Sequence, residues 1–133
     1  MSNDRFDLTG KVAVIVGGTQ GMGLRIAEMF AQSGAKVMVS SRNAADAEAV
    51  AQSLNEKYGN GPDIAAGFAA DMTVKEQLQA LVDATLAKFG KITTLVASPT
   101  IRPFFGSAID TPDDELDAQY LYIFKSRFWI SVE

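Results

Sequence analysis

The sequence predicts an α/β fold: a doubly wound, parallel sheet of about four strands, left incomplete, with helices on both of its faces. Two observations lead to this class. Short apolar runs rich in β-branched residues alternate along the chain with segments of helical periodicity. Most of the helical segments are bounded by a capping residue or a glycine. With 133 residues, 47% of them hydrophobic and 21% charged, we expect a single domain over residues 1–133.

The first predicted unit is a strand, a helix and a second strand. Val12–Val16 is a continuous apolar run of mostly β-branched residues, which is typical of a strand buried on both faces. After a glycine-rich turn, helical periodicity extends from about Met22 to Ser33 and stops at Gly34. A shorter apolar run at residues 37–39 predicts the second strand.

A second helix and a third strand follow. Asn43 is a suitable N-cap for a helix that ends at Gly59. One apolar face of this helix is made by Ala47, Val50, Ala51, Leu54 and Tyr58. Residues 64–70 predict a weaker strand, which ends at Asp71.

The third helix begins with a pattern typical of a capping box, in which Thr73 is the N-cap and Glu76 stands three residues later. The helix then ends at Gly90. Its packing residues are Leu78, Leu81, Val82 and Phe89. Residues 92–97 predict the fourth strand.

A last helix is predicted over residues 112–132. Thr111 is its expected N-cap, Pro112 its first helical residue, and acidic side chains fill the first turn. From Tyr120 to Ile130 the helix is apolar on nearly all sides, so it must be covered on more than one side. Structure outside this chain or a second subunit would provide that cover, and the two are compatible.

The charge balance and the missing residue types exclude several classes. With 12 basic and 16 acidic residues the net charge is −4 and no cationic run is present, so neither nucleic acid nor a membrane surface is an expected partner. Cysteine and histidine are absent, so no disulfide and no metal site is predicted. The chain shows no secretory signal and no run long enough to span a bilayer, and we expect a cytoplasmic protein.

A glycine-rich loop after the first strand indicates nucleotide binding. Gly17 allows a tight turn, Gly21 removes a Cβ where the backbone would approach a pyrophosphate, and Gly23 allows the helix to pack close to the sheet. The N-terminus of that helix presents unpaired N–H groups and a positive dipole end to the anion. Glycines that serve packing alone are the alternative, but the position in the first strand–helix–strand unit favours a Rossmann-type dinucleotide site.

The lead-in at residues 6–11 (FDLTGK), the GxxxGxG spacing of these glycines, and Asp71-Met72 after the third strand resemble the short-chain dehydrogenase/reductase family. The match runs from about Phe6 to about Phe128 and corresponds to the N-terminal half of a typical member. This resemblance implies a sheet of order 3-2-1-4. It also implies an oxidoreductase that transfers hydride between a nicotinamide cofactor and a carbonyl or alcohol.

The resemblance further implies roles for individual residues. Asp71 would accept a hydrogen bond from the adenine amino group, and the backbone N–H of Met72 would donate to the adenine ring. Ala97, at the end of the fourth strand, would lie beside the cofactor. The positions expected to line the phosphates and the ribose are Thr19, Gln20 and Met22.

The end of the second strand predicts which cofactor is bound. NAD-dependent enzymes usually carry an acid about 20 residues beyond the glycines, where it accepts hydrogen bonds from the ribose hydroxyls. Here the strand ends with Ser40, Ser41 and Arg42, and the first acid is Asp46 in the next helix. The planar guanidinium of Arg42 suits a 2′-phosphate and Ser41 adds a hydroxyl, so we expect NADP(H). A solvated Arg42 paired with Asp46 is the alternative.

No catalytic residue can be assigned in this chain. The family uses a Tyr as acid/base, a Lys four residues later that lowers the pKa of that Tyr, and a Ser on the fifth strand. The residues four positions after Tyr58, Tyr120 and Tyr122 are Pro62, Phe124 and Ser126. We therefore expect a chain truncated within the long helix after the fourth strand, which would meet its small carbonyl or alcohol substrate only when the catalytic half is supplied.

Two departures from the family pattern keep a second function open. Members typically carry Asn-Asn-Ala-Gly where this chain has residues 97–100 (ASPT), and an Asn near the place of Ile123. These departures favour a non-catalytic nucleotide-binding or oligomerisation module derived from the same family. An S-adenosylmethionine-dependent methyltransferase also begins with a glycine loop, but it commonly has an acid where Arg42 stands. The unprotected fourth strand and the apolar last helix predict a homo-oligomer.

Overall fold

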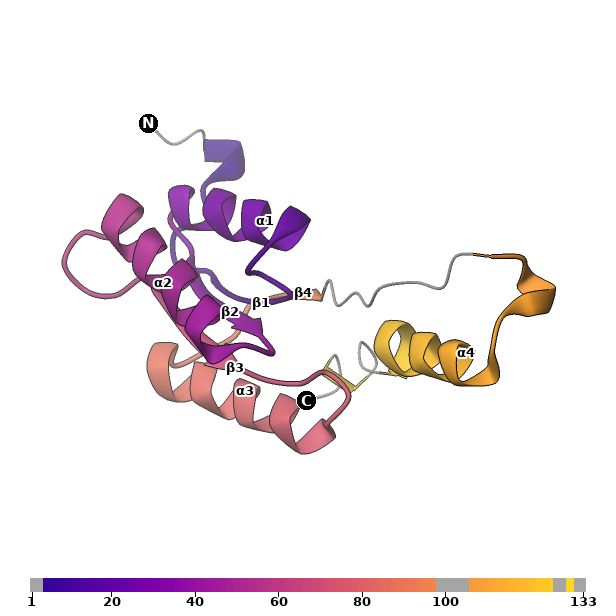
Figure 1. Cartoon of the computed structure of the whole chain (residues 1–133). Helices are drawn as coiled ribbons and strands as arrows, with labels where there is room; N and C mark the ends of the chain where they lie inside the picture. The colour runs from indigo at the N-terminus through magenta and orange to yellow at the C-terminus, as the bar shows by residue number, and fades with distance from the viewer. Residues whose placement is uncertain (1–3, 98–105, 126–128, 131–133) are drawn as a thin grey trace.

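The computed structural model describes residues 4–97, 106–125 and 129–130, and its centre is a four-stranded parallel sheet. The strands are β1 (Val12–Val16), β2 (Lys36–Ser41), β3 (Ala65–Ala69) and β4 (Thr94–Ala97). The α-helices are α1 (Gly21–Gln32), α2 (Ala44–Tyr58), α3 (Lys75–Phe89) and α4 (Asp113–Gln119). The remaining elements are two 3-10 segments, η1 (Asp4–Phe6) and η2 (Ala108–Asp110), and a π-helical segment, η3 (Tyr120–Lys125). The order β3-β2-β1-β4 confirms the predicted topology (Figure 1).

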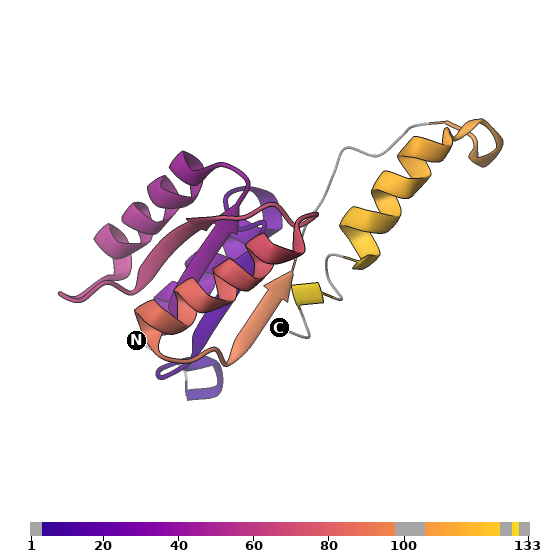
Figure 2. The ribbon, with the colours of Figure 1, turned by 90° about the horizontal axis from the view of Figure 1, so that it is seen from below.

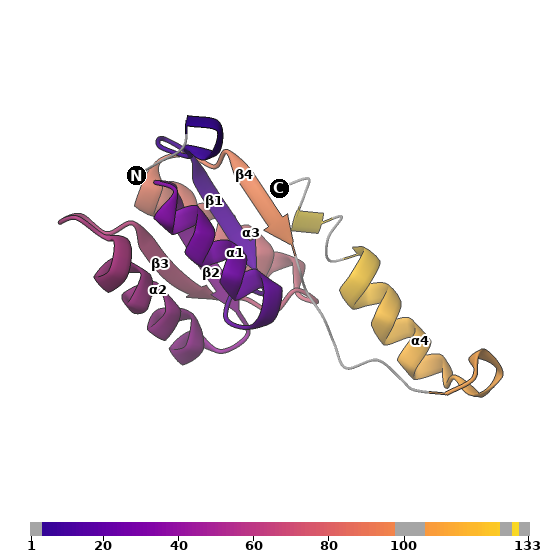
Figure 3. The same ribbon diagram turned by 90° about the horizontal axis from the view of Figure 1, so that it is seen from above.

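Helices cover both faces of the sheet, which confirms the doubly wound arrangement. Figure 3 looks onto α1 and α2, and Figure 2 onto α3 on the opposite face. The layer beneath α1 and α2 contains Ala13, Ile15, Ala27, Ala31, Val37, Val39, Ala51, Leu54 and Ala65. The layer beneath α3 contains Val14, Val16, Met38, Ala70, Met72, Leu78, Leu81, Val82 and Ile130. β1 lies between β2 and β4, and its side chains alternate between the two layers. It is therefore buried along its whole length.

Two predicted helix boundaries are confirmed by the geometry of the caps. Asn43 is the N-cap of α2, and its side chain accepts hydrogen bonds from the N–H groups of Ala45 (2.9 Å) and Asp46 (3.3 Å). Gly90 ends α3 in the left-handed region at φ +84°, where its N–H donates to Leu86 O at 2.8 Å. Each of these capping residues forms hydrogen bonds only with residues close to it in the sequence, so both helix boundaries could be predicted from the sequence.

The predicted capping box at the start of α3 is wrong. The helix begins at Lys75 with Val74 as its N-cap, and Glu76 is exposed in the first turn. The Thr73 hydroxyl instead donates to Asp71 Oδ1 at 2.7 Å, and the Thr73 N–H donates to the same oxygen at 2.9 Å. The Asp71 carboxylate, two residues earlier, therefore accepts hydrogen bonds from both donors of Thr73. These bonds keep Thr73 outside the helix.

The start of the last helix also differs from the prediction. α4 begins at Asp113 with Pro112 as the N-cap, so Pro112 lies one position earlier than expected. Thr111 lies outside the helix, and its hydroxyl donates to Ser107 O at 3.2 Å. The acidic first turn is present as predicted.

Beyond its start, the predicted helix of residues 112–132 is not one uniform α-helix. At Tyr120 it widens into the π-helical segment η3. α4 stands away from the sheet in Figures 1 and 3, whereas Ile130 is buried in the layer beneath α3, with Trp129 packed against that layer. No helix in the described ranges is long and apolar enough to cross a membrane.

Candidate cofactor site

The predicted nucleotide-binding residues lie together at one end of the sheet, the end formed by the carboxyl ends of its strands. Val16 of β1 pairs with Ser40 of β2 and with Ala97 of β4. Ser41 of β2 pairs in turn with Ala69 of β3. The loops that leave these strand ends carry the other predicted positions. Ligands of open parallel sheets bind at this edge, where the strand order reverses.

The glycine loop after β1 contains left-handed residues and is fixed to β2. Gly17 has φ +80° and Gly21 has φ +59°, a region that glycine adopts without steric cost. The N–H groups of Gly17 and Gly18 both donate to Ser40 O, at 2.9 and 3.3 Å. The chain therefore leaves β1 in a tight turn that is held against the end of β2.

Gly23 is buried because the first turn of α1 passes directly over the start of the loop. A Cβ at position 23 would lie 2.0 Å from Gly17 O and 2.8 Å from Gly17 C. The close packing that was predicted for Gly23 therefore involves the loop backbone rather than the sheet. A Cβ at Gly21 would meet no atom within 4 Å, so the backbone there is open to a ligand.

The N-terminus of α1 presents N–H groups at the same edge. Gln20 is the N-cap in an extended conformation, and its side chain makes no capping hydrogen bond. The first turn contains no acidic residue, and Met22 is 76% exposed there. The first-turn amides and the positive end of the helix dipole therefore fit the linked phosphates of a dinucleotide. Thr19 precedes the cap and is half-buried.

Ser41 and Arg42 stand at the end of β2, beside the start of α2. Arg42 is exposed, and the first acid after it, Asp46, lies in the first turn of α2. The Ser41 hydroxyl donates to Asn43 O at 2.9 Å and accepts from the Asn43 N–H at 3.2 Å. Because this hydroxyl already donates within the turn, Ser41 would have to rotate before it could donate to a phosphate. Arg42 thus carries the positive charge of this strand end.

Asp71 and Met72 follow β3 and are held firmly. Asp71 Oδ1 accepts both donors of Thr73, and the Asp71 N–H donates to Gln77 Oε1 at 2.7 Å. The Met72 side chain is 4% exposed and packs in the layer beneath α3. Met72 would therefore contact a ligand through its backbone, as the family resemblance implies.

The end of β4 completes the edge. Ala97 is half-buried there. The rest of the divergent stretch, residues 98–100, lies outside the described residues. Ile123 belongs to η3, but its side chain is not among the parts that the structure describes. Within the described ranges, no group of three or more His, Cys, Asp or Glu side chains is placed to hold a metal ion.

Ser40 is a residue of this site that the sequence pattern did not single out. Its side chain is fully buried, and its Oγ has no hydrogen-bond partner in the described structure. Its carbonyl accepts both loop amides from Gly17 and Gly18, so Ser40 joins β2 to the glycine loop. The available signal was a hydroxyl directly after an apolar run. That signal does not reveal which face of the sheet the side chain occupies.

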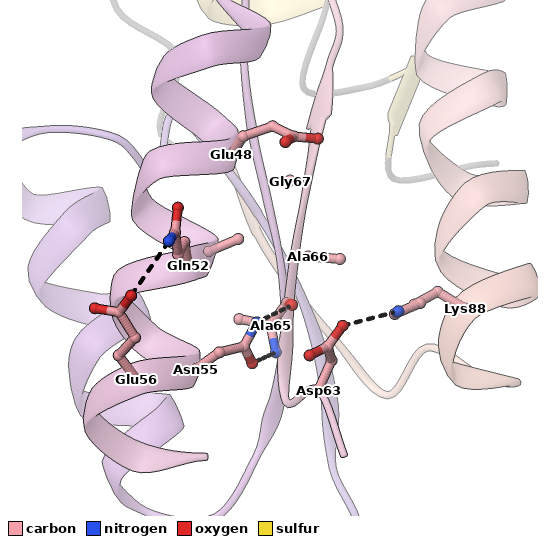
Figure 4. A pocket seen from close by; sticks show the side chains of 10 residues that line it. Glu48, Gln52, Asn55, Glu56, Asp63, Ala65, Ala66, Gly67 and Lys88 are labelled. Carbon is pink, nitrogen blue, oxygen red and sulfur yellow. Dashed lines mark hydrogen bonds and ion pairs between the residues drawn. The ribbon is translucent and has the colours of Figure 1, made fainter. Parts of the chain in front are cut away.

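A separate cavity of about 510 Å³ opens along the outer edge of β3, between α2 and α3 (Figure 4). The Asn55 side chain crosses it: Nδ2 donates to Ala65 O at 2.9 Å, and Oδ1 accepts from the N–H groups of Ile64 (2.8 Å) and Ala65 (2.9 Å). Lys88 forms an ion pair with Asp63 at 3.2 Å on the other wall. None of the predicted cofactor-binding residues lines this cavity.

Comparison with known proteins gives consistent matches. A model of the short chain dehydrogenase family matches residues 11–133. Dehydrogenase/reductase SDR family member 4 of Caenorhabditis elegans is 36% identical over 119 residues, which cover 90% of this chain and 45% of that protein. D-Threitol dehydrogenase of Mycolicibacterium smegmatis is 38% identical over 114 residues, which cover 86% of this chain and 40% of the relative. The chain thus spans slightly less than half the length of these relatives.

Solved structures of enzymes also superimpose on this chain. A hydroxysteroid dehydrogenase from Escherichia coli superimposes with a TM-score of 0.85 at 32% identity, over 97% of this chain and 52% of its own. L-Sorbose reductase from Gluconobacter frateurii, complexed with NADPH, also gives 0.85 at 27% identity, over 96% and 47%. A 3-ketoacyl-(acyl-carrier-protein) reductase from Brucella melitensis, complexed with NADH, gives 0.82 at 33% identity, over 95% and 49%. Together with the glycine loop and the sheet order, these matches show that the chain belongs to the short-chain dehydrogenase/reductase family.

Proposed function

We propose that this chain binds NADP(H) in preference to NAD(H) and forms the cofactor-binding half of an oxidoreductase. The observation that carries the preference is the exposed Arg42 at the end of β2, with no acid before Asp46. A carboxylate there would repel a 2′-phosphate, whereas a guanidinium donates to it with fixed planar geometry. Solved relatives are complexed with NADPH in one case and with NADH in another, so the fold alone does not select the cofactor and the proposal rests on this strand end.

In this proposal, residues at the carboxyl ends of the strands each bind a different part of the dinucleotide. The first-turn amides of α1 bind the linked phosphates, and Arg42 with Ser41 binds the 2′-phosphate. Asp71 and the backbone of Met72 face the adenine, and Ala97 lies toward the nicotinamide. Thr19, Gln20 and Met22 line the phosphates and the ribose. The bound cofactor supplies the nicotinamide ring that takes up or releases hydride.

The proton that accompanies hydride transfer has to be handled by other residues. No tyrosine of this chain is followed four positions later by lysine. The acid/base for a small carbonyl or alcohol would come from a further part of the protein.

We also propose that residues 112–132 contribute to a subunit interface, since Leu116 and Tyr120 are exposed large hydrophobic side chains in that segment.

Cofactor titration tests the preference. We expect NADPH to bind at least about tenfold more tightly than NADH in a fluorescence titration, and Arg42→Ala to remove most of that difference. Lys57→Ala, at an exposed cation in the last turn of α2, is the matched control and should leave the ratio unchanged. Equal affinities of the unaltered chain for the two cofactors would contradict the proposal.

A second candidate is a nucleotide-binding module without catalysis. It is favoured by the ASPT sequence at residues 97–100 and by Ile123, where family members carry polar groups. Adding a C-terminal half that bears the Tyr-x-x-x-Lys pair and assaying NADPH oxidation with a panel of carbonyl compounds separates the two. Turnover supports the oxidoreductase, whereas cofactor binding without turnover supports the module.

A further inference from the structure

The loop between α2 and β3 presents an exposed Asn-Gly pair. Asn60, Gly61 and Pro62 are all exposed, and the loop projects at the left of Figure 1. Gly61 has φ +103°, and a Cβ there would meet no atom within 4 Å. In the part of the chain that the structure describes, neither Asn60 nor Gly61 has a hydrogen bond. The pair is therefore accessible to water and unrestrained by neighbouring groups.

Both ends of this loop are fastened to one residue. Asn55 O accepts the N–H of Gly59 at 2.9 Å, where the loop leaves α2. The Asn55 side chain also binds the backbone where the loop enters β3: it accepts hydrogen bonds from the N–H groups of Ile64 and Ala65 and donates to the carbonyl of Ala65. Figure 4 shows the bonds between Asn55 and Ala65. The tip at residues 60–62 can therefore change its backbone conformation while α2 and β3 stay in place.

We propose that Asn60 is a site of spontaneous deamidation, in which it converts to aspartate and isoaspartate. The Gly61 backbone nitrogen gives up its proton and attacks Asn60 Cγ. The new N–Cγ bond closes a five-membered succinimide, the Cγ–Nδ2 bond breaks, and the amide nitrogen leaves as ammonia. Water then opens the ring at either carbonyl, so the backbone continues through the original carbonyl carbon or through Cγ. No oxidant or reductant is required.

The local geometry favours this reaction at Asn60 over the other described asparagines. Gly61 has no side chain to hinder the attacking nitrogen. The Asn43 side chain is engaged as the N-cap of α2, with Ala45 and Asp46 as donors. Asn55 lies within α2 and makes the side-chain bonds given above. Deamidation at Asn60 places one additional negative charge three residues before Asp63, which lines the cavity between α2 and α3.

The test is peptide mapping of the native protein after incubation in mildly alkaline buffer. We expect the Asn60 peptide to gain the mass difference of an OH replacing an NH₂, to split into two isomers, and to accept methyl groups from an isoaspartate methyltransferase. The Asn43 and Asn55 peptides of the same sample should remain unchanged, which makes them internal controls.

Two variants and an unfolded sample complete the experiment. Asn60→Gln should abolish the product, and Gly61→Ala should slow it because a Cβ hinders the attacking nitrogen. The positive φ of Gly61 strains an alanine, so circular dichroism must show that this variant is folded. In urea, Asn60 should react at nearly its native rate, whereas Asn43 and Asn55 react only when unfolded. Conversion of native Asn60 no faster than native Asn43 would overturn the proposal.

Discussion

At Gly23 the backbone of α1 lies so close to the glycine loop that one added carbon has no space. In Gly23→Ala the new Cβ would lie 2.0 Å from Gly17 O, so the loop would have to move away from the Ser40 carbonyl that holds it. We expect a loss of about 3 kcal/mol in the free energy of unfolding, as for other overpacked sites, together with loss of NADPH binding. Urea denaturation and cofactor titration measure the two effects.

The matched control for Gly23 is Gly10→Ala. Gly10 has φ +84° and its Cβ would meet no atom within 4 Å, so the change adds backbone strain without a collision. A cost of about 1 kcal/mol is expected from the left-handed conformation alone, with cofactor binding unchanged. If both variants lost the same stability, the contact between Gly23 and Gly17 would not be the cause.

At the residue scale, the sequence predicted what depends on the local backbone. The tight turn at Gly17 and the small residue at Gly23 follow from a strand that leads at once into a helix. The burial of the Ser40 hydroxyl, which has no hydrogen-bond partner among the described residues, could not be predicted, because alternation in a strand does not say which face the side chain occupies. The donation of the Ser41 hydroxyl to Asn43 O was hidden for a similar reason, since it depends on how the turn folds.

Among the elements, the edge strand β3 depends on a side chain from α2. Asn55→Ala removes three hydrogen bonds to Ile64 and Ala65 and leaves part-buried backbone groups without their partners. We expect a loss of about 1–3 kcal/mol in the free energy of unfolding, reduced slightly by the higher helix propensity of alanine. Hydrogen exchange at the Ile64 and Ala65 amides should accelerate. Gln52→Ala removes only an exposed bond to Glu56 on the same helix, and it should change neither quantity.

Sequence patterns predicted the elements well and their ends unevenly. Asn43 and Gly90 were recognised because each cap acts on its own helix. The capping box at Thr73 failed because the Asp71 carboxylate competes for the same donors. β4 begins at Thr94 rather than at residue 92, because the Thr93 hydroxyl accepts from Val12 N–H (2.9 Å) and donates to Val12 O (3.1 Å) at the strand's start.

For the whole molecule, the alternation of elements and the family resemblance together predicted the order β3-β2-β1-β4 and the helices on both faces. They did not predict that α4 stands away from the sheet while Ile130 is buried in the layer beneath α3. An apolar helix indicates that it needs cover, but the pattern does not say which surface provides the cover. The transition from α-helix to π-helix at Tyr120 also has no signal in the apolar periodicity.

The open side of β4 predicts how the molecule behaves in solution. β4 is an edge strand that pairs with β1, and among the described residues no strand pairs with its other side. Leu95, in its middle, is 37% exposed, although it pairs with the buried Val14. An apolar edge without charge or bulge is a template for pairing with another chain, so we expect concentration-dependent association in sedimentation equilibrium. Leu95→Lys should shift the protein toward monomer, since an edge lysine opposes pairing. Leu86→Lys, at a 44% exposed position on α3, is the control, and an equal shift in both variants would show that the association does not depend on the edge of β4.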